Sequence, residues 1–229
     1  MLVVIRGAGD IATGIALRLY RAGMQVVMCD LAQPTSIRRT VCFSEAIRLG
    51  ETTIEGVRGV LCEDAEVARL AAQSACVAAP AGGAAGAAGK LGPAALAPAE
   101  LARLADYVLV EADGSKRLPL KAHAAWEPVV PEGSTQSVLV VGASGFGRPV
   151  REAVHRPERF CELAGCSPED EATPETVAAV IRAEGVADRV VVNQCEGEGA
   201  LACARRLAGL LCMPVAAGSL REGRLERLR

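Results

Sequence analysis

Short apolar runs that alternate with helical patterns constrain the fold of this chain more than any other feature. The runs are nearly uncharged and lie at residues 2–5, 24–29, 107–111, 137–141 and 189–193. Strands that alternate with helices along a chain favour a parallel sheet covered by helices. We therefore predict an α/β fold, a three-layer sandwich with these runs in one mainly parallel sheet that is Rossmann-like or P-loop-like.

Helical patterns fill most of the intervals between these runs. Ile11, Ile15 and Leu19 form an apolar stripe that predicts a helix over 10–21. Further helices are expected at 64–74, at 99–104, from Pro157 to Leu163, from Thr173 onward and over 201–211, with short strands at 75–79 and 214–217. The polar stretch 33–60 has too little periodicity to assign an element.

The chain of 229 residues is expected to form a single α/β domain over 1–229. Within it, a Rossmann-like βαβ head covers 1–79 and a second part covers 99–229. The segment 80–98 between them is expected to be a flexible loop, because residues 80–89 are only Ala, Gly and Pro and can bury little surface.

Charge and composition exclude several classes of protein. The 25 basic and 27 acidic residues give a net charge of -2, and aromatic residues make up only 3%, so a basic or base-stacking nucleic-acid binder is not expected. No apolar run has the length of a membrane-spanning helix, and the start lacks the basic segment of a signal peptide. We expect a cytoplasmic protein without a membrane partner.

The nine cysteines do not indicate a metal site. None forms a Cys-x-x-Cys pair, and the chain has only two histidines. Zinc sites need a characteristic spacing of such ligands, which is absent here. The cysteines are interpreted as reduced thiols of a cytoplasmic protein.

A glycine-rich turn follows the first predicted strand and opens the first predicted helix. Gly7 and Gly9 match the first two glycines of a dinucleotide-binding turn, and Thr13 lies in the same loop-to-helix segment. Asp30 ends the second strand, where an acid can bind a ribose hydroxyl. Asp10 would place negative charge where a phosphate binds, so the alternative is a tight turn whose helix is capped by this acid. Gly7, Gly9, Thr13 and Asp30 are the candidate cofactor-binding residues here.

Two acids followed by basic residues end the strand at 107–111. Glu111 and Asp113 are two positions apart and share a face if the strand extends that far. Mg²⁺ takes one or two carboxylates together with phosphate oxygens, so both acids are candidate metal ligands and catalytic residues. Lys116 follows as a candidate catalytic residue, and Arg117 and Lys121 could also neutralise phosphate. The alternative is a polar turn with its charges in solvent.

Two further segments carry candidate residues. The predicted strand at 189–193 ends in Asn193-Gln194-Cys195-Glu196. This string resembles the Asn-Lys-x-Asp motif that binds purine bases, with Gln in place of Lys and Glu in place of Asp. Asn193 and Glu196 are therefore candidates for base binding. An ordinary turn after the strand is the alternative. His155 is a candidate general base or phosphate contact, with a capping or ion-pair role as the alternative, and His123 has the same ambiguity.

One familiar phosphate-binding motif is absent. The sequence contains no Gly-x-x-x-x-Gly-Lys-Ser/Thr, and Gly89-Lys90 is followed by Leu91 rather than by a hydroxyl residue. The glycine-rich turn at the start also has no lysine. A standard P-loop triphosphatase is therefore not expected from this chain alone.

The chain resembles two families in two pieces. Residues from about 89 to 229 resemble the YqeC-type family of selenium-dependent hydroxylase accessory proteins. The resemblance is carried by Gly89–Leu91, the strings at 105–121, 127–131 and 154–158, and the strand end at Asn193–Gln194. Residues 1–60 resemble the companion YqeB type, through the strings at 4–14, 37–40 and 43–46 and Pro34. A YqeC-type chain would be expected to open with a Gly-Lys-Thr loop, whereas this chain has Gly9-Asp10-Ile11, as in a fusion or hybrid.

The resemblance implies a cytoplasmic accessory factor in the maturation of a selenium-dependent molybdenum hydroxylase. Its partners would then be that hydroxylase or its cofactor-biosynthesis proteins, and its ligands a nucleotide, either a triphosphate or a dinucleotide, together with Mg²⁺. Two alternatives remain open: an NAD(P)-type dinucleotide-dependent oxidoreductase and a non-catalytic interaction scaffold. The glycine turn and Asp30 favour the first of these, and the missing lysine favours the second.

Overall fold

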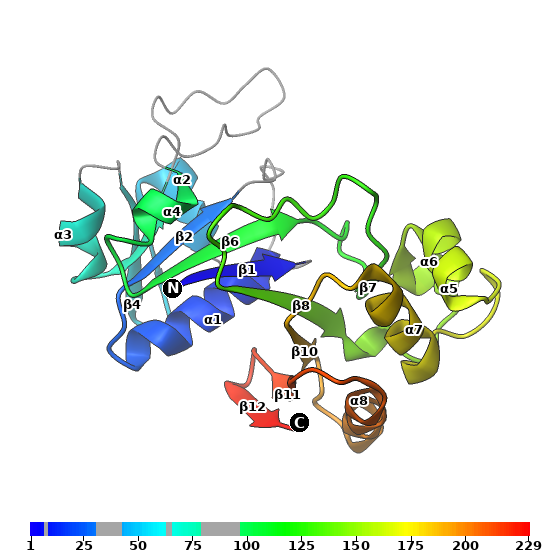
Figure 1. Ribbon diagram of the computed structural model, residues 1–229. Coiled ribbons are helices and arrows are strands. Elements are labelled where there is room, and N and C mark those ends of the chain that lie inside the picture. Colours follow the sequence, from blue (N-terminus) through cyan, green and yellow to red (C-terminus); the bar gives the residue numbers. More distant parts are fainter. Residues whose placement is uncertain (7–8, 31–42, 63–65, 79–96) are drawn as a thin grey trace. The chain divides into compact units, whose positions relative to one another are not determined.

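A computed structural model describes residues 1–6, 9–30, 43–62, 66–78 and 97–229 (Figure 1). The chain divides into two compact units. Unit 1 comprises Met1–Ile5, Gly9–Ala112 and Val129–Thr135, and unit 2 comprises Arg6–Ala8, Asp113–Pro128 and Gln136–Arg229. Each unit combines helices with largely parallel strands, so the predicted α/β class is confirmed, while the single-domain organisation stays a prediction. A flexible loop was predicted over 80–98; residues 80–96 of this segment lie outside the described residues, and Pro98 begins a helix.

Unit 1 contains most of the strands predicted for the first half of the chain. Its helical elements are α1 (Gly9–Arg21), η1 (Phe43–Glu45), α2 (Ala46–Leu49), α3 (Val67–Ala71) and α4 (Pro98–Leu101). Its strands are β1 (Leu2–Arg6), β2 (Val26–Asp30), β3 (Glu51–Ile54), β4 (Val57–Cys62), β5 (Ala75–Ala78) and β6 (Tyr107–Asp113).

The strands of unit 1 follow the order β1-β6-β2-β5-β4-β3. β2 is parallel to both β6 and β5, and β4 is parallel to β5. The predicted strand–helix–strand succession of β1, α1 and β2 is present, with α1 running alongside the strands (Figure 1). However, β6 lies between β1 and β2 in the sheet, so the first two strands of the chain are not neighbours.

Sequence analysis missed the antiparallel hairpin of β3 and β4. These strands pair Thr52 with Gly59 and Ile54 with Val57, and only Glu55 and Gly56 connect them. Both connecting residues have positive φ, 48° and 79°. That combination is typical of the tight hairpin turns that match the twist of paired strands. The hairpin lies in the stretch 33–60, where the polar residues of β3 hid the strand pattern.

Unit 2 contains the second half of the predicted elements. Its helical elements are η3 (Ala143–Gly145), α5 (Val150–Ala153), α6 (Pro157–Ala164), α7 (Pro174–Glu184) and α8 (Glu198–Leu210). Its strands are β7 (Leu120–Lys121), β8 (Gln136–Gly142), β9 (Val154–His155), β10 (Arg189–Asn193), β11 (Val215–Ser219) and β12 (Arg224–Arg227). The bounds of β10 are the predicted ones, and α7 begins after the predicted cap at Thr173, whose hydroxyl accepts a hydrogen bond from Thr176 N.

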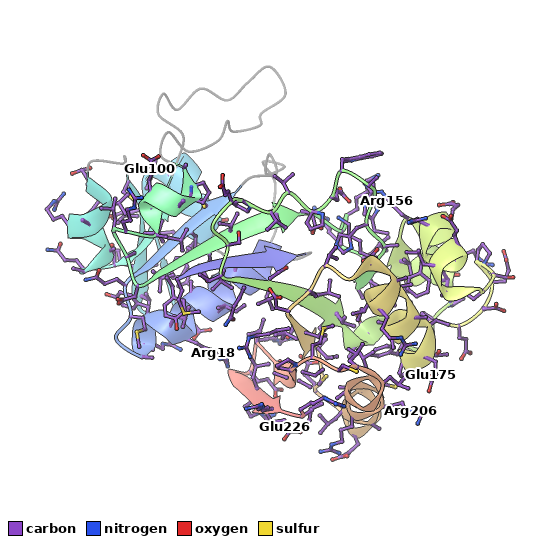
Figure 2. The ribbon with its side chains drawn as sticks, in the orientation of Figure 1. Arg18, Glu100, Arg156, Glu175, Arg206 and Glu226 are labelled. Atoms are coloured by element: carbon purple, nitrogen blue, oxygen red, sulfur yellow. The ribbon has the colours of Figure 1, made fainter. Side chains whose placement is uncertain are left out.

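The strands of unit 2 follow the order β12-β11-β10-β8, and the short pair β7-β9 forms a second sheet. β10 is parallel to β8 and β11, and only β12 runs antiparallel to its neighbour. Phe160, Leu207 and Leu211 are fully buried in the core beneath these strands. On the surface, Arg206 of α8 donates a hydrogen bond of 2.7 Å to Glu175 of α7 (Figure 2), a contact of small energetic weight because both side chains are exposed.

Among the residues that the structure describes, no helix is long and apolar enough to cross a membrane. This agrees with the absence of a long apolar run in the sequence.

The packing of unit 1 predicts a strong effect of one glycine. Gly59 of β4 faces the ring of the fully buried Phe43, and a Cβ at position 59 would overlap this ring. Gly59→Ala should therefore destabilise unit 1 by about 1–3 kcal/mol, the cost of overpacking a filled core. Urea denaturation measures this loss. In the Phe43→Leu background the same substitution should cost clearly less, and equal costs in both backgrounds would contradict the clash.

Candidate functional site

Asp113 is the last residue of β6 and the most deeply buried acid among the described residues. β6 is buried along almost its whole length, and Asp113 is 2% exposed. Ligands in open α/β sheets bind outside the carboxyl ends of the strands, which is where this carboxylate lies. A buried ionised carboxylate is costly unless it is paired, so its surroundings decide what it can do.

Two cations of unit 2 meet one oxygen of Asp113. Oδ2 lies 2.9 Å from Nε2 of His123 and 3.1 Å from Nζ of Lys121. Both cationic side chains are also buried, with 3% and 5% of their surface exposed. Oδ1 of Asp113 is buried and has no hydrogen-bond partner among the described residues. The carboxylate is thus neutralised on one side and has a free acceptor on the other.

Each of the two basic residues that contact Asp113 also contacts a second acid. On one side, Glu184 of α7 accepts hydrogen bonds from the ring Nδ1 of His123 and from its backbone N, each at 2.7 Å. On the other side, Lys121 lies 2.9 Å from Glu127, and Arg156 contacts the same carboxylate at 2.8 and 3.1 Å. We call this set the charge chain. Its members alternate in sign, in the order Glu184, His123, Asp113, Lys121, Glu127 and Arg156.

Local backbone structure fixes the positions of these side chains. Lys121 belongs to β7, which pairs in parallel with β9 so that Lys121 is in register with His155. Arg156 follows β9 in the left-handed conformation, φ 65°, and caps α6 before Pro157 (Figure 2). Lys121 also donates to the carbonyl of Gly114 at 2.9 Å. Its ammonium therefore lies against two carboxylates of the charge chain and one carbonyl of the adjacent loop.

The charge chain shifts the pKa values of its members. Burial alone would raise the pKa of Asp113, but contact with His123 and the charge of Lys121 hold it below its ordinary value. Burial would lower the pKa of His123, but Asp113 and Glu184 together raise it. The pKa of Glu127 is lowered against the effect of burial by Lys121 and Arg156. The two carboxylates beside His123 therefore favour its protonated, cationic form.

This arrangement limits the chemistry of His123. A general base needs a neutral nitrogen with a free lone pair near its substrate. Both ring nitrogens of His123 are instead held by carboxylates, and its protonated form is stabilised. His123 therefore positions and neutralises Asp113, whose Oδ1 is buried and has no hydrogen-bond partner among the described residues. A pocket lined by apolar side chains such as Phe160 and Ile181 adjoins His123 and Glu184.

His155 has the opposite electrostatic environment. Burial together with the positive charges of Arg156, Lys121 and Lys116 lowers its pKa. It is partly exposed and lies outside the charge chain, although it is in register with Lys121. A neutral imidazole surrounded by cations can contact an anion or accept a proton. The candidate role of His155 as a base or phosphate contact stays a prediction, and its setting is compatible with it.

The loop after Asp113 presents basic side chains to solvent. Lys116 and Arg117 are exposed and have positive φ, 52° and 67°. The loop leads into β7, and its last residue, Pro119, accepts a hydrogen bond of 2.8 Å from Gly142 N at the end of β8. A Cβ at Gly142 would approach Pro119 and the Gln194 side chain to 2.8 Å, so this close approach requires glycine. Lys116 is thus free to reach an anion, whereas Lys121 is committed to the charge chain.

The other candidate residues of the first half of the chain were assigned to metal or cofactor binding. Glu111 of β6 is 7% exposed, and it is in register with Asp30, the last residue of β2. Thr13 of α1 is buried, and its hydroxyl accepts a hydrogen bond of 3.2 Å from Phe43 N. Gly9 is the first residue of α1, and Gly7 lies outside the described residues. The cofactor roles of Gly7, Gly9, Thr13 and Asp30 stay predictions.

Asn193 and Glu196 bind the turn that follows β11. Asn193 Oδ1 accepts from Leu220 N at 2.9 Å, and Glu196 accepts from the Ser219 hydroxyl at 2.8 Å. These contacts join the carboxyl ends of β10 and β11 and account for both residues without a ligand. These contacts do not test the predicted role of Asn193 and Glu196 in binding a purine base, which stays a prediction.

Metal binding by Glu111 and Asp113 also stays a prediction. Among the described residues, no group of three or more His, Cys, Asp or Glu side chains could hold a metal ion. Mg²⁺ does not need such a group, since it commonly binds one or two carboxylates plus phosphate oxygens and water. Oδ1 of Asp113 is a donor of the right kind, while Oδ2 already faces two cations.

Sequence reasoning missed three members of the charge chain. Glu127, Arg156 and Glu184 had no assigned role, although Glu127 and Arg156 lie in strings that carry the family resemblance. Lys121, Glu127 and Arg156 come together only because β7 pairs with β9. The one sequence feature that pointed to these ion pairs was the presence of both basic and acidic residues within 121–127. Nothing in the sequence linked Glu184 to His123.

Fold and site together define an α/β protein with a buried, cation-neutralised carboxylate at a strand end. The family model of the YqeC protein matches residues 23–158, more than half of the chain, and the chain belongs to this family. The match begins within the part assigned above to the YqeB-type head and ends before α7. It includes every member of the charge chain except Glu184.

Two relatives from Escherichia coli (strain K12) carry the names of the two types that the chain was predicted to resemble. The chain is 56% identical over 70 residues to the uncharacterized protein YqeB, covering 30% of this chain and 13% of that protein. It is 36% identical over 78 residues to the uncharacterized protein YqeC, covering 34% of this chain and 30% of that protein. The matches therefore span less than a third of the length of either relative.

The two histidines of the chain should titrate in opposite directions from the ordinary value of 6.5. His123 should lose its proton above pH 6.5 and His155 below it, because carboxylates surround the first and cations the second. Two-dimensional NMR of the imidazole groups measures both pKa values. His155→Gln identifies the lower titration by removing it. A value for His123 below 6.5 would contradict the charge chain.

Stability of unit 2 should depend on pH through the same groups. The raised pKa of His123 contributes stability that is complete below pH 6.5 and is lost as pH rises through its folded value. The lowered pKa of Asp113 contributes stability that is present above pH 3.8 and is lost as pH falls through its folded value. Denaturation followed across pH should show both declines.

His123→Gln tests the alkaline decline of this profile. It should lower stability near pH 6 by about 3–5 kcal/mol, since it leaves two buried carboxylates without their shared cation. It should also remove the decline above pH 6.5 that the parent shows. His155→Gln is the matched control and should keep that decline.

Proposed function

We propose that this protein is a nucleotide-binding accessory factor in the maturation of a selenium-dependent molybdenum hydroxylase. Family membership supports the accessory role that the resemblance implies. The observation that carries the nucleotide part is the buried Asp113, with one oxygen unpaired at the carboxyl end of β6 and exposed basic residues directly after it. Its partners would be the hydroxylase or proteins that build its cofactor.

Each group at this strand end has a part in the proposal. Oδ1 of Asp113 accepts a Mg²⁺ ion or a water bound to it, and the bound metal would neutralise phosphate charge. Lys116 and Arg117 hold the phosphate groups, with neutral His155 as a further contact. Lys121 and His123 keep Asp113 ionised, so its free oxygen is ready at neutral pH.

A dinucleotide-dependent oxidoreductase is the second candidate. In its favour, Asp30 is the last residue of β2, the position at which an acid binds a ribose hydroxyl. Against it, β6 separates β1 from β2, whereas the first two strands of a dinucleotide-binding half are neighbours. The strand order therefore favours the mononucleotide proposal.

Calorimetry with a panel of nucleotides, with and without Mg²⁺, separates the candidates. The proposal expects binding of a nucleoside triphosphate that requires Mg²⁺. Binding of a dinucleotide without Mg²⁺ would support the oxidoreductase, and the absence of any binding would leave an interaction scaffold. Asp113→Asn should abolish the Mg²⁺-dependent signal if Oδ1 is the metal ligand, with circular dichroism as the control for folding.

Lys116→Ala should weaken triphosphate binding about tenfold, the effect of losing one charge-assisted contact of roughly 1.5 kcal/mol. Lys116 is exposed, so this change should leave stability unchanged. Arg103→Ala, at an exposed basic residue of unit 1, is the matched control and should bind like the parent. Equal affinity of all three proteins would remove Lys116 from the site.

A further inference from the structure

The C-terminal end of α6 brings two cysteines together. Cys161 lies in the last turn of the helix, and Cys166 follows Gly165, whose φ of 68° ends the helix in the left-handed conformation. The carbonyl of Cys161 accepts hydrogen bonds from Gly165 N at 2.8 Å and from Cys166 N at 3.3 Å. In helix caps of this kind, the side chains at these two positions are commonly in contact.

Both side chains are available for chemistry with each other. They are free thiols of intermediate exposure, and both pack against the core of unit 2. Burial, a hydrogen bond to the Cys166 thiol and the nearby charges of Cys166, Asp170 and Glu158 raise the pKa of Cys161 to about 11. Cys161 therefore stays protonated near neutral pH and suits the second, ring-closing step of an exchange better than the first attack. The spacing of the pair along the sequence gave no sign of this contact, because no common dithiol motif has four residues between its cysteines.

We propose that Cys161 and Cys166 form a redox-active dithiol site that exchanges with an external disulfide. The thiolate of one cysteine attacks a sulfur of that disulfide, whose S–S bond breaks and releases one thiolate. The second cysteine gives its proton to solvent and attacks the mixed disulfide, which releases the other thiolate. The pair loses two electrons and two protons, and the external disulfide gains them.

The backbone is compatible with the closed form of this site. A disulfide needs Cα atoms roughly 4.4–6.8 Å apart, and the backbone hydrogen bond from Cys166 to Cys161 holds the two residues close together. The loop that the bond would close is short, so its entropic stabilisation of the fold is at the low end of the range for disulfides. Reversible chemistry is therefore a better account of the pair than a structural cross-link.

Peptide mapping after incubation with oxidised glutathione tests the proposal directly. Trypsin cleavage after Arg159 and Arg182 yields the peptide 160–182, which contains these two cysteines and no other. The peptide from the oxidised parent should be lighter by two hydrogen atoms and should resist alkylation until it is reduced. The exchange should also accelerate as pH rises, since the attacking species is a thiolate. A fully alkylated peptide 160–182 after oxidation would overturn the proposal.

A trivalent arsenical, which bonds two neighbouring thiols and releases water, provides an independent test that needs no oxidation. Phenylarsine oxide should protect Cys161 and Cys166 together from alkylation in the parent. Cys161→Ser and Cys166→Ser should each lose this protection, with at least about tenfold weaker binding at the remaining thiol because the second bond is no longer intramolecular. Cys212→Ser, at an exposed cysteine, is the matched control and should behave like the parent. Equal protection in all variants would show that the pair does not act as one site.

Discussion

The burial of one ionised carboxylate dictates much of the structure around it. Asp113 ends β6 inside unit 2, where an unpaired charge would cost several kcal/mol. It is tolerated because Lys121 and His123 contact its Oδ2, and these two buried cations need acids of their own. Glu127 and Glu184 supply them, so a single buried charge links β6, β7, the start of α6 and the end of α7.

Neutralisation by side chains changes the expected behaviour of the two acids of β6. Neighbouring carboxylates repel each other unless a cation or a shared proton lies between them. The cations of the charge chain instead lower the pKa of Asp113. A ligand is thus not required to hold this carboxylate in its charged form. On the other side of the carboxylate, Oδ1 is a buried acceptor that has no hydrogen-bond partner among the described residues, whereas Oδ2 lies within ion-pair distance of two cations.

The elements that sequence analysis predicted well are those in which local pattern and tertiary burial agree. β10 is an apolar run bounded by polar residues, and α7 carries a cap, a proline and an acid in its first turn, so both were placed correctly. The hairpin β3–β4 was missed because one strand is mostly exposed and polar, with only Glu55-Gly56 marking its turn. Likewise, Asp113 could be found as an acid at a strand end, but its partner cations could not, because β7 has only two residues and its pairing with β9 is long-range.

Backbone strain is concentrated at the same rim of unit 2. Among the described non-glycine residues with positive φ, Lys116, Arg117, Arg156 and Gln194 belong to this unit, and only Glu55 lies elsewhere. Each such conformation costs of order 1–3 kcal/mol and persists only where surrounding contacts determine it. For Arg156 the compensating contact is visible, since its guanidinium holds Glu127. Lys116 is exposed and has no comparable ion pair with any residue that the structure describes, so no contact with the charge chain compensates for its strained backbone. The loop after Asp113 thus differs from the buried charge chain, because its strained backbone at Lys116 and Arg117 carries side chains that are exposed.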